Sequence, residues 1–350
     1  MQMTDAGFSS ICKETERYEF ICAILVIVYR GEMLMNYVVV DFEWNQSMGG
    51  RDAMRKRVPF EIIEIGAVLL DEDLNEIDRF SQTVRPKIYR KLHRITKELT
   101  GITQEELDAS DPFSYVLVDF MLWCGNDFTF CTWGNTDLIE LQRNMKYYHL
   151  DDLLPGPIKY YNVQKLFREL VMPQQRSAAL ETAIEYLGIP ENENFHRAVN
   201  DAAYTAAVMR HLDMEAASRL FSVDYYQNPK SRAQEIHITY DKYYKFISKE
   251  FSGREEALAD REVRALRCYK CDNDVKIKIR WFSGKSHAYY CLGYCPVHGW
   301  IRGKIRIKKT DENRTYVVKT VRIIEEERAQ KIRHMKEEIA DKRRERRHTE

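Results

Sequence analysis

The 350-residue sequence predicts an α/β domain followed by a small β-rich module, and three observations support this prediction. Apolar runs of strand length alternate with helix-spaced segments over residues 37–213. The two segments also differ in charge. Residues 37–213 hold 19 basic and 28 acidic side chains, whereas residues 263–322 hold 15 basic and 4 acidic side chains. Four of the eight cysteines fall within the second, basic segment: Cys268, Cys271, Cys291 and Cys295.

The first domain, which we place at residues 36–213, alternates strand and helix signals along its length. The apolar runs that predict strands are Tyr37–Val40, Glu61–Leu70, Phe80–Val84 and Phe128–Gly134. Helical spacing of apolar residues predicts helices over Phe113–Trp123, Val163–Val171, Ala178–Leu187 and Ala198–Leu212. Between them, Gly101 ends one short helix and Thr103 caps the next, with Glu106 at the capping-box position.

The segments after this domain have other patterns. Residues 214–262 are polar and near neutral, which predicts a linker with helical pieces. Residues 263–322 form the basic, cysteine-containing module. Residues 323–350 are almost entirely charged, and mixed charges at helical spacing are typical of a solvated helix or a disordered tail.

Residues 1–35 do not fit the globular pattern, and we predict that they are disordered or a non-native extension. Their apolar stretch, Phe20–Tyr29, is about ten residues long, against the roughly twenty that a membrane-spanning helix requires. Residues 30–32 can be encoded by a purine-rich run resembling a ribosome-binding site, and Met33 and Met35 follow at once. We therefore expect a protein that starts at one of these methionines and has no membrane segment.

Two carboxylates directly follow the first apolar run, in the sequence YVVVDFEW. Asp41 and Glu43 are two residues apart, so an extended chain places both side chains on one face. We expect them at the end of the strand, where ligands collect in open α/β sheets. Burying two like charges without a partner costs several kcal/mol, and a divalent cation removes this cost. Taken alone, however, such a pair is often only surface charge.

Two later segments carry further candidate ligands. Asp137 follows the strand FTFCTW where a helix begins, a position that the helix dipole favours for an acid even without a metal. His196 and Asp201 are five residues apart, which places them on different faces of a regular helix. They can approach one point if His196 lies on the loop before that helix, whereas otherwise the histidine is a cap or a core hydrogen-bonding residue.

Together these residues resemble the DEDDh family of 3′–5′ exonucleases, of the RNase T and DNA polymerase III epsilon superfamily. The three motifs of that family, D-x-E, an aspartate at a helix start, and H-x4-D, are present in order. The sequence segments around these motifs resemble the Eri-type branch of the family. This branch is similar to the sporulation-inhibitor enzyme and acts mostly on RNA. The segments are EIIEIGAVLLD, LTGITQEELD, WGNTDLIEL, ALETAIEYLGI and FHRAVNDAAYTA. The resemblance covers about Asn36–Asp213 and implies a ribonuclease H-like fold, with a mixed sheet flanked by helices.

The resemblance also implies a two-metal hydrolysis of the 3′-terminal phosphodiester bond of single-stranded RNA or DNA, with RNA favoured. Two Mg²⁺ or Mn²⁺ ions about 4 Å apart would polarise the phosphate. By this resemblance Asp41 bridges both ions, and Glu43 and Asp201 hold one of them. Asp137 would hold the other through water. His196 would accept the proton of the attacking water, and the products would be nucleoside 5′-monophosphates.

Phe42 and Trp44 flank the carboxylates and are candidate substrate-binding residues. An aromatic face stacks on a nucleic-acid base with about 1–3 kcal/mol. Strand alternation, however, points Phe42 away from the carboxylates and toward the core.

The cysteine module predicts one structural Zn²⁺ ion. Cys268 and Cys271 form a knuckle of zinc-ribbon type, and Cys295 and His298 repeat the two-residue gap. Cys291 competes for the fourth position. We favour the set with His298, because the two-residue gap reproduces the turn that aims both ligands inward. Cysteines used as metal ligands, without a disulfide framework, indicate a reducing, cytoplasmic location.

Strands beside the knuckles alternate cationic and apolar residues. The cations are Lys276, Lys278 and Arg280, then Lys304, Arg306 and Lys308; the apolar residues are Ile277, Ile279 and Trp281, then Ile305 and Ile307. The pattern predicts one apolar face and one cationic face, which either binds a polyanion or is solvated.

Two other functions share these features. DNA polymerase proofreading subunits carry the same motifs, although the Eri-like sequence segments disfavour that function. A non-catalytic nucleic-acid-binding module could keep the fold, but every acid and the histidine are present.

Overall fold

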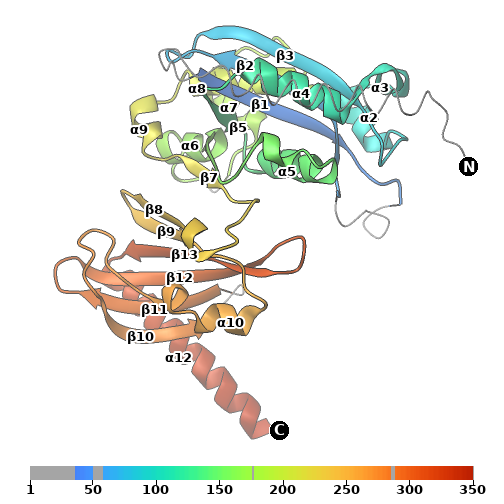
Figure 1. The fold of residues 1–350 in the computed structure, drawn as a ribbon. Helices are drawn as coiled ribbons and strands as arrows, with labels where there is room; N and C mark the ends of the chain where they lie inside the picture. Colours follow the sequence, from blue (N-terminus) through green and yellow to red (C-terminus); the bar gives the residue numbers. More distant parts are fainter. Residues whose placement is uncertain (1–35, 50–57, 176, 285–287, 350) are drawn as a thin grey trace, which may run out of the picture. The chain divides into compact units, whose positions relative to one another are not determined.

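The computed structural model describes residues 36–49, 58–175, 177–284 and 288–349, which form two compact units (Figure 1). The first unit extends to Leu212 except for residues 154–159, which belong with the second unit. The predictions for residues 1–35 lie outside the described residues. Within the described ranges, no helix combines the length and the apolarity that crossing a membrane requires.

The first unit has a mixed sheet flanked by helices, as the sequence predicts. Its strands follow the order β4-β3-β2-β1-β5-β6; β1 pairs antiparallel with β2 and parallel with β5. The elements are β1 (Asn36–Asn45), β2 (Glu61–Leu70), β3 (Glu76–Arg85), α2 (Arg94–Thr100), α3 (Gln104–Ala109), β4 (Asp111–Pro112), α4 (Phe113–Cys124), β5 (Phe128–Thr132), α5 (Thr136–Tyr147), β6 (Ile158–Asn162), α6 (Val163–Leu170), α7 (Leu180–Leu187) and α8 (Ala198–Met209).

The break between α2 and α3 has the predicted turn chemistry. Gly101 follows α2 with a φ of 70°, a left-handed conformation that favours glycine. The Thr103 side chain accepts a hydrogen bond of 3.1 Å from the Glu106 backbone N–H at the start of α3. The Glu106 carboxylate lies 3.5 Å from Arg197, so this glutamate also pairs with a distant part of the chain.

The second unit contains a fully antiparallel sheet with the order β10-β11-β12-β13-β9-β8. Its elements are α9 (Met214–Ser218), β7 (Ser222–Asp224), β8 (Ile236–Tyr240), β9 (Tyr243–Ile247), α10 (Arg254–Ala259), α11 (Arg261–Arg264), β10 (Lys276–Ser283), β11 (Ala288–Cys295), β12 (Gly299–Lys309), β13 (Thr315–Ile323) and α12 (Glu326–Thr349).

The prediction that residues 214–262 form a linker with helical pieces is wrong for β8 and β9. Strand β9 pairs with β13, and Val318 lies opposite Ile247, so this hairpin completes the sheet. Its side chains supply part of the core, because Phe246 and Ile247 are fully buried. The signal was missed because the apolar residues of this hairpin are separated by tyrosine, lysine and threonine.

The predicted division into apolar and cationic faces holds on β12 and fails on β10. On β12, Ile305 is fully buried, whereas Arg306 is exposed. The register of β10 shifts between Ile277 and Ile279 and again before Phe282, and such bulges move the following side chains to the other face. As a result Ile279 packs under α12, whereas Trp281 packs in the core on the opposite face.

Residues 323–350 were expected to be a solvated helix or a disordered tail. These residues form helix α12. The first half of the helix packs on the sheet, because Ala329 and Ile332 are buried against Leu292 of β11. The apolar residues of this half are spaced at one helical turn, a signal that the surrounding charges conceal.

Candidate active site and zinc site

The strand pair β1–β2 carries the first two acids. Asp41 lies opposite Gly66, and Glu43 lies opposite Glu64. These acids were expected at the end of the strand, but the strand continues beyond them to Asn45 along β2. Its parallel pairing with β5 ends earlier, at Val39. Asp41 and Glu43 therefore lie just beyond the end of the parallel pair, the position at which such sheets bind ligands.

Helix α8 brings Asp201 to these acids by resting directly on β2. A Cβ atom on Gly66 would lie 2.0 Å from the Val199 nitrogen and 2.1 Å from the Ala198 carbonyl carbon. Only glycine permits this approach. One oxygen each of Asp41, Glu43 and Asp201 then lie within 4.8 Å of one another.

Glu64 and Arg197 hold the start of this helix, and the sequence analysis did not single them out. The Glu64 carboxylate is fully buried; one oxygen accepts the Ala198 N–H at 3.0 Å and the other accepts Arg197 Nη2 at 2.6 Å. Glu64 thus caps α8 from the neighbouring strand. The available signal was a glutamate in the middle of the apolar run EIIEIGAVLL, where an uncompensated charge is costly.

The concentration of acids raises their pKa values. Burial and then the charges of Asp201, Glu64 and Asp137 raise the pKa of Glu43 to about 8, against the lowering effect of Arg197. Burial, followed by the same kind of repulsion, raises the pKa of Asp41 well above its usual range. Burial raises the pKa of Asp201 to about 6, although the His196 N–H and the His196 charge oppose this shift.

The other two predicted residues lie outside the three-acid group. Asp137 is buried in the first turn of α5, where burial raises its pKa to about 7 and its charge acts on Asp41. His196 lies on the loop before α8, with a φ of 65°, and its side chain is exposed. Its backbone N–H donates to Asp201 Oδ2 at 3.1 Å.

The two aromatic candidates differ in exposure. Phe42 is 2 % exposed and belongs to the core, as strand alternation predicts. Trp44 is partly exposed, and its ring lies 5.8 Å from that of Phe60. A register shift between Glu43 and Trp44 re-aims this tryptophan.

The donor set fits a divalent cation. Oxygens bound to one Mg²⁺ at about 2.1 Å lie about 3.0 Å apart when adjacent and about 4.2 Å apart when opposite. The three oxygens lie within 4.8 Å of one another, so a bound ion would draw them closer together. Asp201 Oδ1 is buried and has no hydrogen-bond partner within the described part of the chain. A bound cation would satisfy this oxygen and reduce the repulsion between the acids.

Comparison with known families identifies this domain. The sequence model of the RNase T exonuclease family matches residues 38–209. The first domain is an exonuclease domain of the RNase T family. The matched range includes the D-x-E pair on β1, the aspartate at the start of α5, the histidine just before α8 and the aspartate in its first turn.

Curated relatives match the same half of the chain. Mouse 3′-5′ exoribonuclease 1 is 26% identical over 193 residues, which are 51% of this chain and 53% of that protein. A PolC-type DNA polymerase III of Clostridium perfringens is 33% identical over 50% of this chain and 11% of the polymerase. The probable 3′-5′ exonuclease KapD of Bacillus subtilis is 28% identical over 47% of this chain and 78% of that protein. The chain thus spans about half of the first relative and a tenth of the second.

Among solved structures, the nuclease domain of 3′hExo bound to rAMP, a DEDDh family member, is 25% identical to this chain, with a TM-score of 0.47. The similarity covers 56% of this chain and 98% of that one. The family match ends at residue 209, so residues 213–350 of the second unit lie beyond it.

In the second unit, the four favoured zinc ligands converge. The Sγ atoms of Cys271 and Cys295 are 3.7 Å apart, and His298 Nδ1 lies 3.4 Å from Cys268 Sγ and 3.9 Å from Cys295 Sγ. A tetrahedral zinc ion with Zn–S bonds of about 2.3 Å places two sulfurs about 3.8 Å apart. Although desolvation opposes it, hydrogen bonds from the backbone N–H groups of His298 and Val297 lower the pKa of Cys295 to about 6, which favours the ligating thiolate.

Cys291 lies apart from this group. It is fully buried in β11 opposite Gly303, and a Cβ atom on that glycine would lie 2.5 Å from its sulfur. Burial raises the pKa of the Cys291 thiol to about 12. The second knuckle is instead the turn between β11 and β12, with Cys295 opposite Gly299.

Proposed function

We propose that the protein is a metal-dependent 3′–5′ exonuclease that removes nucleotides from single-stranded nucleic acid, with RNA as the favoured substrate. The observation that carries this proposal is the convergence of Asp41, Glu43 and Asp201, together with a buried Asp201 oxygen that has no hydrogen-bond partner among the described residues. The exonuclease family match and the exoribonucleases among the curated relatives support it. The products are nucleoside 5′-monophosphates.

In this proposal Asp41, Glu43, Asp137 and Asp201 hold two Mg²⁺ or Mn²⁺ ions. When bound, these ions polarise the scissile phosphate, stabilise the leaving 3′ oxygen and lower the pKa of the attacking water. The imidazole of His196 accepts the proton of that water, and its exposed position leaves it free to reach the substrate. Trp44, which is partly exposed, contacts the terminal base. Phe42 is buried and packs in the core on the other face of the strand.

We further propose that Cys268, Cys271, Cys295 and His298 bind one structural Zn²⁺ ion. Their thiolates require a reducing compartment, consistent with the predicted cytoplasmic location. Metal analysis of the purified protein tests this assignment, with one zinc per chain expected for the wild type and less than 0.2 for Cys268→Ser as a rough limit.

Incubation of the purified protein with end-labelled single-stranded RNA and DNA of one sequence tests the main proposal. We expect stepwise shortening from the 3′ end with Mg²⁺ or Mn²⁺, and no shortening with EDTA. Chromatography should identify 5′-monophosphates as products. Shortening that persists in EDTA, or internal cleavage, would contradict the proposed mechanism.

DNA is the alternative substrate, because a PolC-type DNA polymerase III is among the relatives, at 33% identity. The same experiment separates the two, since a rate on DNA more than about tenfold above that on matched RNA corresponds to a preference of about 1.4 kcal/mol. Such a result would assign the domain to DNA processing.

A further inference from the structure

The sheet of the second unit places two arginines directly opposite each other. Arg302 on β12 pairs with Arg322 on β13. The same cross-strand row continues through Leu292 on β11, which packs under α12. Arg302 and Arg322 therefore share the face on which α12 docks, next to its apolar contact. Like charges directly opposite each other destabilise a sheet, so this pair needs an explanation.

Neither arginine is neutralised within the described residues. The Nε atoms of both are buried and have no hydrogen-bond partner there, and neither forms an ion pair with a described carboxylate. Burial and the charge of Arg322 lower the pKa of Arg302. Because no described carboxylate offsets these two facing charges, an anion from outside the protein would relieve their repulsion.

Further cations and aromatic rings surround the pair. Lys304 and Arg306 lie two and four residues beyond Arg302 on β12 and thus on the same face. The Lys304 ammonium lies 5.5 Å from the centre of the Tyr290 ring, and the Arg322 guanidinium lies 4.8 Å from that of Tyr243. Cations interleaved with aromatic rings are typical of surfaces that bind single strands.

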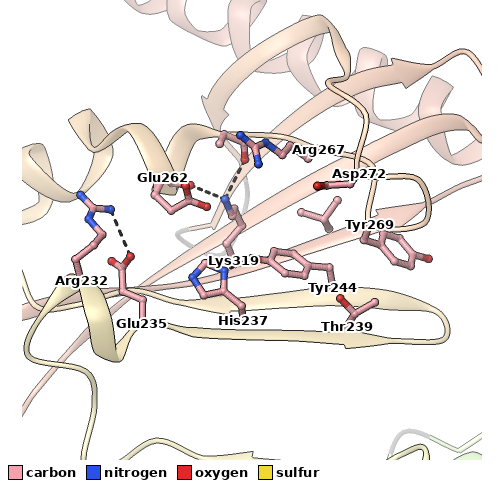
Figure 2. Close-up of a pocket in the computed structure, with 12 residues that line it drawn as sticks. Arg232, Glu235, His237, Thr239, Tyr244, Glu262, Arg267, Tyr269, Asp272 and Lys319 are labelled. Carbon is pink, nitrogen blue, oxygen red and sulfur yellow. Dashed lines mark hydrogen bonds and ion pairs between the residues drawn. The ribbon is translucent and has the colours of Figure 1, made fainter.

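A pocket on the opposite face of this sheet provides a contrast (Figure 2). It has a volume of about 600 Å³ and also contains cations, but these have partners. Lys319 Nζ donates to the carbonyls of Glu262 and Ala265 at 2.6 and 2.9 Å. Arg232 pairs with Asp260 at 2.6 Å and with Glu235 at 3.4 Å. The cations of the pocket therefore stabilise the fold and require no external anion.

We propose that Arg302 and Arg322, together with Lys304 and Arg306, bind phosphate groups of a single-stranded nucleic acid. The inference rests on the proposed function in that this strand is the substrate of the exonuclease domain. A phosphate matches the planar fork of the guanidinium group. It would accept hydrogen bonds from the guanidinium N–H groups and offset the repulsion between the two arginines.

The test compares two double variants of the full chain in an Asp41→Asn background, so that hydrolysis does not consume the probe. Arg302→Gln/Arg322→Gln removes the pair, and Arg261→Gln/Arg264→Gln removes two exposed charges from α11, which packs through Val263 on the opposite face. Fluorescence anisotropy measures the Kd of a labelled 20-nucleotide RNA and of matched DNA over a series of salt concentrations.

We expect Arg302→Gln/Arg322→Gln to raise Kd by about tenfold or more and to reduce the salt slope by about 1.4 in magnitude, or 0.7 for each lost phosphate contact. Its thermal midpoint should stay equal or rise, because the repulsion is gone. The control variant should bind as the parent does. Lys304→Gln/Arg306→Gln, which changes more accessible side chains, should also weaken binding and provides the test if the first variant does not fold.

Unchanged binding in both test variants, or an equal loss in the control, would overturn the proposal. Competition by poly-glutamate at the same charge concentration as RNA would also overturn it, in favour of an acidic peptide. The outcome is separate from that of the proposed function, because binding is measured without hydrolysis. If wild-type protein degrades no strand but the arginine variant loses affinity, the exonuclease proposal fails and this one stands.

Discussion

The two candidate metal sites differ in what brings their ligands together. The cysteines and the histidine of the second unit come from two short turns, at residues 268–271 and 295–298. The acids of the first unit come from β1 and α8, 160 residues apart, and the register of β1 on β2 and the contact of α8 with Gly66 position them. The fold therefore brings the acids together, whereas we expect a zinc ion at the second site to help its own unit to fold. Loss of metal should have opposite consequences at the two sites.

The largest effect should come from removing an acid. Asp41→Asn or Asp201→Asn should reduce the rate of strand degradation by about 10³-fold or more, because each removes a ligand that no neighbour replaces. The thermal midpoint without divalent ions should stay equal or rise, since repulsion falls. A gel assay and calorimetry check both. A variant that keeps more than a tenth of the wild-type rate at saturating Mg²⁺ would count against the site.

Removing His196 should have a somewhat smaller effect. His196→Ala should lower the catalytic rate by about 10²- to 10⁴-fold, the usual contribution of a general base. Mg²⁺ affinity should change little, because the side chain is outside the three-acid group. The rate of the variant should recover partly as pH rises. If the rate and its pH profile match the wild type, the histidine only supports the loop through its backbone N–H.

At the zinc site the effect should be on stability rather than on chemistry. Cys268→Ser should lower the unfolding midpoint of the second unit by about 10 °C or more, since structural zinc binding contributes directly to folding. Hydrolysis of a dinucleotide should stay within about twofold. Cys291→Ala is the matched control and should keep one zinc per chain. Loss of zinc from this control would instead make Cys291 a ligand.

The smallest expected effect is a pH dependence of stability in the first unit. Without Mg²⁺, the folded protein keeps protons on Glu43, Asp137 and Asp201 up to pKa values of about 8, 7 and 6, whereas the unfolded chain loses them near pH 4. Stability should therefore fall as pH rises from 5 to 8, because the folded state binds more protons in this window.

Differential scanning fluorimetry should detect this as a decrease of about 5 °C in the first transition between pH 5 and pH 8. Saturating Mg²⁺ should abolish most of the decrease, and Asp41→Asn/Asp201→Asn should flatten it without metal. A midpoint that is constant across this range in the metal-free wild type would show that the acids are solvated and weakly coupled.

Sequence spacing predicted that the four cysteine and histidine side chains converge, because each pair is local and a two-residue gap defines its own turn. It could not predict the acid site in this way, since register and helix packing join Asp41 to Asp201; the resemblance to a family supplied that link. Glu64 and Arg197 were missed because their pairing joins a strand to a helix start 133 residues later.

In the fold, too, features set by neighbouring residues were predicted, whereas features set by residues far apart in the sequence were not. The helix break at Gly101 and the cap at Thr103 were predicted, because turn chemistry is local. The β8–β9 hairpin and the shift within β10 were not, because a strand's partner and its bulges depend on the sheet that receives it.

The contact between α8 and Gly66 sets a limit on substitution at this position. Because the backbone of Val199 occupies the space of a Cβ, every amino acid except glycine would push the helix outward, and Asp201 would move with it. Gly66 carries no functional group, yet exchanging it for alanine would displace an acid from the other two. We therefore expect this position, although it has no side chain, to control the affinity of the domain for a divalent cation.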